Sequence, residues 1–281
     1  MSFRGEAAII GIGELPTRRT IPGMSVGGLM AQAARLAMED AHITRDQIDG
    51  LITEGGDTFP GFAAEYLGIR PRFGTGSSMM GASGATGVTL ASMAVMNGLA
   101  DYVLVVIAQE RNPALPRGIE GFPGPGAEFD FPYGPAAGAN TGYAQIYGRH
   151  MAKYGTTQDQ LAHVAANERA NAQGNENAVF NGQPITHEDV INSRYVNYPL
   201  RLLECVMPCA GAAAVIVTTA ERANASLNKP AYVLGGATAL DDFGGMQRPD
   251  ITVTPVARSA PTAFAMSGYT PRDIQFAEFY D

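Results

Sequence analysis

The sequence repeats one short pattern near its two ends. Ile9-Ile10-Gly11, inside a short apolar run, has an echo at Val233-Leu234-Gly235, 224 residues later. A second string, TRDQIDGLITE (44–54), has an echo in TPRDIQFAEFYD (270–281), 226 residues later. Two matches at nearly the same offset indicate a duplicated unit, which restricts the chain to folds built from two similar halves.

The duplication divides the chain into two parts of unequal length. Residues 1–228 correspond to an N-terminal half, and residues 229–281 correspond to the beginning of a C-terminal half that stops after its second strand. A lone β-α-β unit cannot cover both faces of its own sheet. We therefore expect the second half to be truncated here and to need further structure to complete it.

Apolar runs that alternate with helical patterns predict an α/β fold. The predicted strands are 7–12, 48–54, 102–108 and 212–218, and the predicted helices are 25–42, 82–99, 141–154, 157–173 and one that begins at 186, with Ser25 and Thr157 as N-caps. Residues 82–99 are small and apolar on nearly every face, which favours a helix buried on all sides. Residues 111–139, rich in Pro, Gly, Phe and Tyr, predict a long ordered excursion that serves binding.

Composition argues against several classes of protein. The net charge is −8 and the pI is about 5.0, which argues against nucleic acid as the main partner because phosphate binding needs a basic surface. Two cysteines exclude a disulfide-dense scaffold and favour a reducing compartment. The first residues do not resemble a signal peptide, and no apolar run reaches the ~18 residues of a membrane span. We expect a cytoplasmic protein.

Several local strings occur in a consistent order along nearly the entire chain. They are YGRHMAKYGTT (147–157), NERANA (167–172), NENA (175–178), NYPL (197–200), AGAAA (210–214) and EFYD (278–281). Together with the repeat, they resemble the thiolase superfamily, specifically its lipid-transfer-protein (sterol-carrier-protein-type) thiolases.

This resemblance implies a fold and an assembly. The expected fold is a thiolase-like five-layer α-β-α-β-α arrangement of two duplicated halves, with two sheets around buried helices and residues about 111–200 as the loop region over the site. Family members extend past this point through a Gly-His-Pro segment and a second catalytic cysteine. They pair through the sheet edge near residues 71–79, so a homodimer is expected.

The sequence departs from the family at the position of the catalytic nucleophile. In thiolases a Cys-Ala-Ser-Gly string opens the buried helix, and its thiolate attacks the thioester. Here the string is Gly81-Ala82-Ser83-Gly84. Glycine cannot be acylated, so we expect no acyl-enzyme, whereas free backbone N–H groups from Gly81 to Gly84 would support an oxyanion. Ser83 is expected to cap the helix or orient the substrate.

Some family members that lack the cysteine are aldolases, which cleave β-hydroxyacyl-CoA thioesters, typically of sterol side chains, by a retro-aldol reaction. The resemblance therefore implies an acyl-CoA substrate, with coenzyme A as part of the substrate and no covalently bound cofactor. It also implies a small partner protein with an OB-fold and a zinc ribbon. Tyr280 stands where aldolase-type relatives place a tyrosine, and we expect it to act as acid and base. A strand-end tyrosine with a bonded hydroxyl is the alternative.

Other side chains are candidates for contact with the substrate. Glu110 follows the central strand at the carboxyl edge of the sheet, where ligands of α/β proteins gather, and a buried acid there would orient a loop or tune the site. The aromatic residues of the excursion could form a wall for an acyl or steroid body, or serve as loop anchors; they include Phe129, Tyr133 and Tyr143. His150 lies on a predicted helix and is either a substrate contact or a packed surface histidine.

Two further patterns have simpler interpretations. Cys205 and Cys209 form one C-x3-C pair without a second pair, so we expect plain buried thiols and no metal site. The glycines between residues 74 and 87 resemble a phosphate-binding loop, but no dinucleotide fingerprint is complete, and close helix packing explains them.

Three alternatives to the aldolase remain open from the sequence. The chain could be a non-catalytic subunit that binds lipid or acyl-CoA, or an acyltransferase whose nucleophile lies beyond residue 281. A serine hydrolase built on Ser83 is a more distant alternative, with a histidine drawn from His150, His163 or His187, because the G-x-S-x-G pattern is not met.

Overall fold

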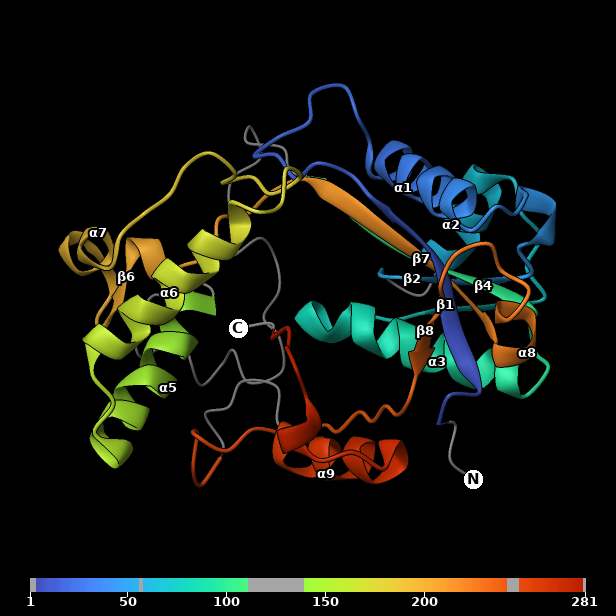
Figure 1. The fold of residues 1–281 in the computed structure, drawn as a ribbon. Coiled ribbons are helices and arrows are strands. Elements are labelled where there is room, and N and C mark those ends of the chain that lie inside the picture. The colour runs from blue at the N-terminus through green and yellow to red at the C-terminus, as the bar shows by residue number, and fades with distance from the viewer. Residues whose placement is uncertain (1–3, 56–57, 111–138, 242–247, 280–281) are drawn as a thin grey trace. The chain divides into compact units, whose positions relative to one another are not determined.

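The chain divides into two compact units. The computed structural model describes residues 4–55, 58–110, 139–241 and 248–279 (Figure 1). The sheet unit consists of residues 1–110, 209–239 and 256–281, and the helical unit consists of residues 111–208 and 240–255. These two units are defined by contacts between residues and do not coincide with the two halves of the sequence repeat. The division of the chain into halves at residue 228 stays a prediction. No described helix is long and apolar enough to cross a membrane.

A mixed sheet forms the centre of the sheet unit. Its six strands, in the spatial order β3-β2-β4-β7-β1-β8, are Phe73–Gly76, Gly50–Thr53, Tyr102–Gln109, Gly211–Thr219, Ala7–Glu14 and Ala231–Val233. β2 is parallel to β3 and β4, whereas β7 is antiparallel to β4 and β1. The four predicted strands correspond to β1, β2, β4 and β7, so the α/β class is confirmed. β3 was not predicted, because its sequence, FGTG, has only one apolar side chain and lacks the apolar run of a buried strand.

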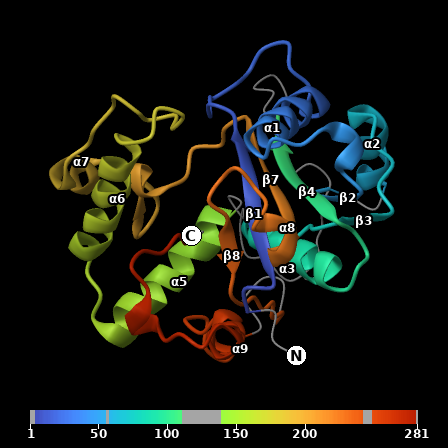
Figure 2. The same cartoon turned by 45° about the vertical axis from the view of Figure 1, so that its right-hand side comes forward.

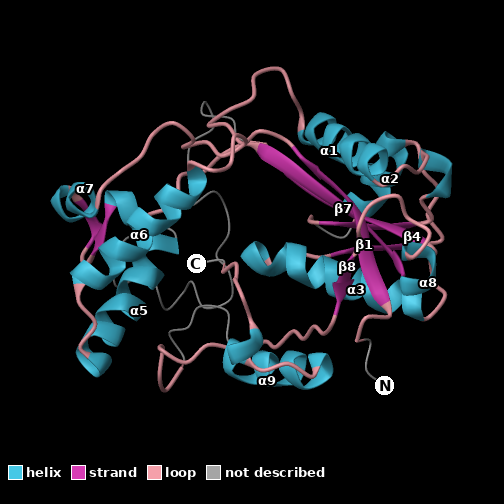
Figure 3. Cartoon of the chain, viewed as in Figure 1, coloured by secondary structure: helices cyan, strands magenta, loops and turns pink. Residues whose placement is uncertain are grey.

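Helices cover both faces of this sheet (Figures 1 and 3). α1 (Val26–Asp40) and α2 (Phe59–Leu67) pack on one face and α3 (Ser83–Met96) on the other. Successive strand residues point to opposite faces. Leu104 of β4 therefore joins the core under α1, and its neighbour Val103 joins the core under α3. The remaining helices and 3-10 turns of the unit are η1 (Arg45–Gln47), η2 (Met80–Ala82), α8 (Ala220–Ala223), α9 (Val256–Ser267) and η5 (Pro271–Asp273).

The local sequence signals for helix starts are confirmed. The Oγ of Ser25 accepts a hydrogen bond from the N–H of Gly28 at 3.2 Å and caps α1. In the helical unit, Thr157 and Gln160 form a reciprocal capping box, with distances of 3.0 and 3.3 Å, at the start of α6. Each contact satisfies an N–H group that has no acceptor inside the helix.

The prediction that residues 82–99 form a helix buried on all sides is wrong. Met93 of α3 is about half exposed, because within the described residues the sheet packs against only one side of this helix. On that side the packing is close. A Cβ on Gly87 would lie 2.8 Å from Cγ1 of Val105, so this glycine lets α3 approach β4, as close helix packing predicts.

The sequence repeat recurs in the way strand and helix approach each other. A Cβ on Gly11 would lie 2.5 Å from the carbonyl oxygen of Ala37 in α1. A Cβ on Gly235 would lie 2.5 Å from the carbonyl oxygen of Ala263 in α9. Only glycine permits this approach, so the two copies need the same residue for the same reason.

The register between the edge strand β8 and its neighbour β1 follows the same repeat. β8 lies beside β1 (Figure 2), and Ala8 pairs directly with Tyr232 in an antiparallel ladder. Tyr232 is the counterpart of Ala8 at the repeat offset of 224, so a local two-fold axis passes between the two copies of the strand. The 3-10 turns η1 and η5 also match, because each follows a threonine that belongs to a capping box.

The described part of the helical unit contains two longer helices, a short one and a small hairpin (Figure 3). Its elements are α5 (Ala139–Tyr154), α6 (Gln158–Ala172), α7 (His187–Asn192), β5 (Tyr195–Asn197), β6 (Leu200–Arg201) and the 3-10 turn η4 (Leu202–Glu204). All three helices were predicted from the sequence. The aromatic excursion lies outside the described residues, apart from its last residue, Ala139, which begins α5.

A candidate active site at the start of helix α3

The segment between β3 and α3 holds the position of the missing nucleophile. After β3 the chain passes through η2, which contains Gly81, and α3 begins at Ser83. Met80 has φ 51° and its side chain is 72% exposed. A non-glycine residue in the left-handed region is uncommon and occurs where surrounding contacts hold the backbone in a strained turn, often at functional sites.

Ser83 is the hydrogen-bonding centre of this turn. Its Oγ accepts a bond from the N–H of Met79 at 3.0 Å. The single hydroxyl proton has two acceptors in reach, the carbonyl oxygen of Met80 at 2.6 Å and Oε1 of Glu54 at 3.0 Å. The Ser77 hydroxyl donates to the carbonyl oxygen of Ser83 at 2.8 Å. The side chain is buried and committed to this turn, and none of these partners is a histidine, so a serine hydrolase has no support here.

Capping by Ser83 does not occur. The N-cap of α3 is Ala82, whose side chain makes no capping bond, and Ser83 is the first residue of the helix. The prediction of free N–H groups from Gly81 to Gly84 is also only partly met. The N–H of Ala82 donates to the carbonyl oxygen of Met79 at 3.1 Å. The N–H of Ser83 donates to the carbonyl oxygen of Met80. These two amides are therefore occupied.

Gly84 is the second residue of α3, and a Cβ there would lie 3.7 Å from Cδ1 of Ile107, an ordinary contact. Close packing therefore does not require glycine at this position. The backbone N–H groups of Gly81 and Gly84 are the proposed oxyanion donors, and this role stays a prediction.

Glu54 is a functional candidate that sequence reasoning missed. It follows β2 directly and is half-buried, and its carboxylate reaches the hydroxyl of Ser83. An acidic residue immediately after a buried parallel strand is the same signal that singled out Glu110. The signal was present in the sequence, but nothing there brings residue 54 to the start of the helix at residue 83.

Glu110 is exposed, so the expectation of a buried acid is wrong. The reason lies in the sheet: β4 pairs with β2 only as far as Val106, but continues to Gln109 alongside β7 alone. Past Val106, no strand of the described residues pairs with this edge of β4. Glu110 follows this half-covered end, and its role stays a prediction.

The remaining candidates lie in the helical unit or outside the described residues. Tyr143 on α5 is 44% exposed. His150 on the same helix is exposed, its Nδ1 lies 2.7 Å from Oγ1 of Thr156, and its ring packs against Tyr154. Phe129, Tyr133 and Tyr280 lie outside the described residues. The structure therefore brings together Gly81, Ser83 and Gly84, and it leaves the other assignments as predictions.

Cys205 does not have the surroundings of an activated nucleophile. Both cysteines are reduced and partly exposed rather than fully buried as expected, because they lie in the irregular segment before β7. The Sγ of Cys205 lies 3.2 Å from the carbonyl oxygen of Arg201. Burial, together with the nearby charge of Glu204, raises the pKa of the Cys205 thiol. A raised pKa disfavours the thiolate, which is the reactive form.

Comparisons with known proteins agree with this architecture. Residues 237–281 match the thiolase C-terminal domain-like family. The chain is 33% identical, over 99% of its length and 75% of the relative's, to the 17-hydroxy-3-oxo-4-pregnene-20-carboxyl-CoA lyase of Mycobacterium tuberculosis. It is 30% identical, over 98% of its length and 73% of the relative's, to the acetyl-CoA acetyltransferase of Methanothermobacter thermautotrophicus. Among solved structures, the Ltp2-ChsH2(DUF35) aldolase superposes with a TM-score of 0.85 at 31% identity, covering 97% of this chain and 72% of that one.

These findings and the fold define a thiolase-like α/β protein. The chain belongs to the thiolase superfamily and, within it, is an aldolase-like member.

Proposed function

We propose that the protein cleaves a carbon–carbon bond of a β-hydroxyacyl-CoA thioester by a retro-aldol reaction. The observation that carries this proposal is Gly81, which stands at the start of α3 where the family places its acylated cysteine. The similarity to a lyase and to an aldolase supports the same reaction class. The acyl group is of the lipid or sterol side-chain type.

The reaction needs proton transfers and charge stabilisation, but no nucleophile. A base removes the proton of the β-hydroxyl group, and the Cα–Cβ bond breaks to leave a carbonyl compound and the enolate of the shortened thioester. Protonation of the enolate at Cα completes the reaction. We assign the proton transfers to Tyr280 and the stabilisation of the enolate oxygen to amides of the turn that contains Gly81 and Gly84.

The turn around Gly81 is suited to a thioester for two reasons. Ser83 and Glu54 hold its backbone, so amide dipoles there do not have to reorganise during the reaction. The exposed Met80 side chain offers apolar surface beside them. Glu110, Tyr143, His150 and the excursion residues Phe129 and Tyr133 are proposed as contacts of the substrate body.

Assembly is part of the proposal. A small partner with an OB-fold and a zinc ribbon is proposed by analogy with the solved Ltp2-ChsH2(DUF35) aldolase. A homodimer through the sheet edge near residues 71–79 is also proposed, and β3 is indeed an edge strand of the sheet. The N–H groups of Phe73 and Ser77 face β2, so that of Gly74 faces the open edge of β3. Replacing Gly74 by proline would remove this donor and is expected to give a monomer in analytical ultracentrifugation. We propose the cytoplasm as the location.

Product analysis tests the reaction class. The protein is incubated with 17-hydroxy-3-oxo-4-pregnene-20-carboxyl-CoA in the absence of free coenzyme A, with and without the ChsH2(DUF35) subunit. A ketone and a shortened acyl-CoA in equal amounts are the expected products. Turnover that requires free coenzyme A would instead identify thiolysis, the second candidate, which the acetyl-CoA acetyltransferase relative favours. Tight binding without cleavage in the presence of the subunit would identify a binding protein.

A further inference from the structure

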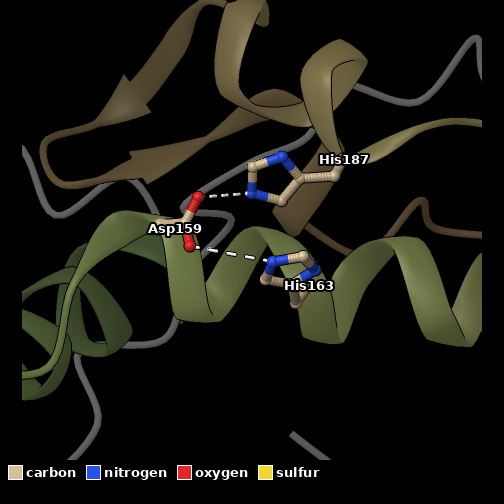
Figure 4. Close-up of side chains that lie close together, drawn as sticks. All are labelled: Asp159, His163 and His187. Carbon is tan, nitrogen blue, oxygen red and sulfur yellow. Dashed lines mark ion pairs between the residues drawn. The ribbon is translucent and has the colours of Figure 1, made fainter.

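Three side chains of the helical unit converge on one point. Asp159 and His163 lie one turn apart on α6, at spacing i and i+4, which places them on the same face of the helix. His187 is the first residue of α7 and points toward the same face (Figure 4). No metal-ligand spacing is visible here in the sequence, because the third residue comes from a different helix.

The distances between the three groups fit ligands of one ion. Nε2 of His187 lies 2.7 Å from Oδ1 of Asp159, and Nε2 of His163 lies 3.7 Å from Oδ2 of the same carboxylate. One ligand atom from each of the three residues lies within 4.8 Å of the others. Ligand atoms of a tetrahedral zinc ion at its usual bond lengths lie about 3.3 Å apart. The distances from Asp159 to His187 and to His163, 2.7 and 3.7 Å, lie on either side of this value.

The contact between His187 and Asp159 does not have the geometry of a hydrogen bond. Nε2 of His187 is buried and has no hydrogen-bond partner among the described residues, although Oδ1 of Asp159 is 2.7 Å away. Two ligands of one metal ion point at the ion rather than at each other. A buried nitrogen beside a carboxylate, but not aimed at it, is therefore the arrangement that a shared cation would satisfy.

The two imidazole rings lie against each other. The rings of His163 and His187 stack at 4.2 Å between centroids with an interplanar angle of 27°. This contact brings a side chain of α6 and a side chain of α7 to the same place.

We propose that Asp159, His163 and His187 bind one divalent transition-metal ion of the zinc type. Two imidazoles and one carboxylate are a ligand set for Zn²⁺, whereas Ca²⁺ and Mg²⁺ prefer oxygen ligands alone. Asp159 and His163 are more than half exposed, so a fourth position is open to water. The ion would join α6 to α7 and stabilise the helical unit.

Local structure holds the ligands in place before any ion binds. The capping box of Thr157 and Gln160 fixes the first turn of α6, where Asp159 lies. The capping box of Thr186 and Asp189 fixes the first turn of α7, which His187 begins. Side chains on fixed first turns lose little freedom on binding, which favours affinity.

Calorimetric titration of the tag-free, metal-stripped protein with ZnCl₂ tests the proposal. One equivalent of Zn²⁺ is expected, with a rise in melting temperature as zinc is added. His163→Ala, His187→Ala and the isosteric Asp159→Asn are each expected to weaken binding at least tenfold. His42→Asn is the matched control, because His42 lies in the sheet unit and asparagine tolerates its positive φ of 54°.

Two results would overturn the site. One is zinc binding that survives in both histidine variants, and the other is no binding by a parent protein shown by circular dichroism to be folded. Replacement of zinc by Co²⁺ identifies the ligand type. Ligand-field bands without thiolate charge transfer are expected, whereas a thiolate band that disappears in Cys205→Ser would place the metal at the cysteines and contradict the proposal.

Discussion

The Oγ of Ser83 lies 3.0 Å from Oε1 of Glu54, which joins the first residue of α3 to the residue that follows β2. The same Oγ accepts a hydrogen bond from the N–H of Met79. The sheet thereby fixes both sides of the turn that contains Gly81. Ser83 is a positioning residue for that turn, and its burial and bonding distinguish it from a nucleophile.

Replacing Ser83 by alanine tests this positioning role. The change leaves the N–H of Met79 without its acceptor, which costs about 1–3 kcal/mol of stability when the group stays buried. We also expect kcat for the cleavage to fall, because the turn loses its link to β2. Urea unfolding and steady-state kinetics measure the two effects. Glu54→Gln keeps an acceptor oxygen and is expected to lose less, and a Ser83→Ala protein with unchanged kcat would contradict the role.

Replacing Gly87 by alanine tests the packing of α3 on the sheet. The new Cβ would lie 2.8 Å from Cγ1 of Val105, so the helix has to shift, at a cost of about 1–3 kcal/mol. Gly61 in α2 is the matched control, because a Cβ there meets nothing within 4 Å. Gly61→Ala is expected to stabilise by about 0.5–1 kcal/mol. Equal effects of the two substitutions in urea unfolding would show that α3 is not closely packed at Gly87.

Asp49 makes the stability of the sheet unit depend on pH. Burial acts to raise the pKa of its carboxyl group, but hydrogen bonds from the N–H of Tyr102, the Arg72 guanidinium and the N–H of Asp101 outweigh it and lower the pKa below the ordinary value of 3.8. A lowered pKa in the folded state contributes stability that is present above pH 3.8 and is lost as the pH falls through the folded value.

Unfolding by urea at several pH values below 5 measures this contribution. Asp49→Asn is expected to lower stability near neutral pH and to reduce the loss of stability below pH 4. Asp46→Asn is the control, since the Asp46 side chain is 89% exposed. An Asp49→Asn protein with the acid sensitivity of the parent would contradict the assignment.

Replacing Tyr280 by phenylalanine removes the proposed acid and base. Loss of one such group typically reduces the rate by a factor of about 10²–10⁴, and we expect kcat to fall within this range without a change in melting temperature. Tyr269→Phe is a suitable control, because that ring lies on the partly exposed surface against the Arg4 side chain. Equal turnover by Tyr280→Phe and the parent would assign the proton transfers to another group.

The sequence predicted most of the fold, for identifiable reasons. β1, β4 and β7 are apolar runs, and α1 and α6 carry their own caps, so local pattern was sufficient. The repeat also predicted which residues play equivalent parts, as Gly11 and Gly235 do in approaching their helices. The exposure of α3 was not predictable, because an apolar surface indicates that a helix can be buried but not how much of it a neighbour covers.

The candidate site was predicted only in part, because its contacts join distant residues. The absence of the nucleophile at Gly81 was visible in the sequence, since it follows from one residue in a recognisable string. The contact of Glu54 with Ser83 was not, because it depends on β2 ending beside the start of α3. The cluster of Asp159, His163 and His187 was missed for the same reason, since α7 brings the third side chain.

Intact-protein mass spectrometry during turnover tests the central claim most directly. The protein is mixed with a β-hydroxyacyl-CoA substrate and quenched while the shortened acyl-CoA accumulates. The account predicts the unmodified mass of the chain at every time point, because position 81 offers no sulfur to acylate. An acyl adduct that forms and decays at the rate of turnover, mapped to Cys205, Cys209 or any other residue, would contradict it.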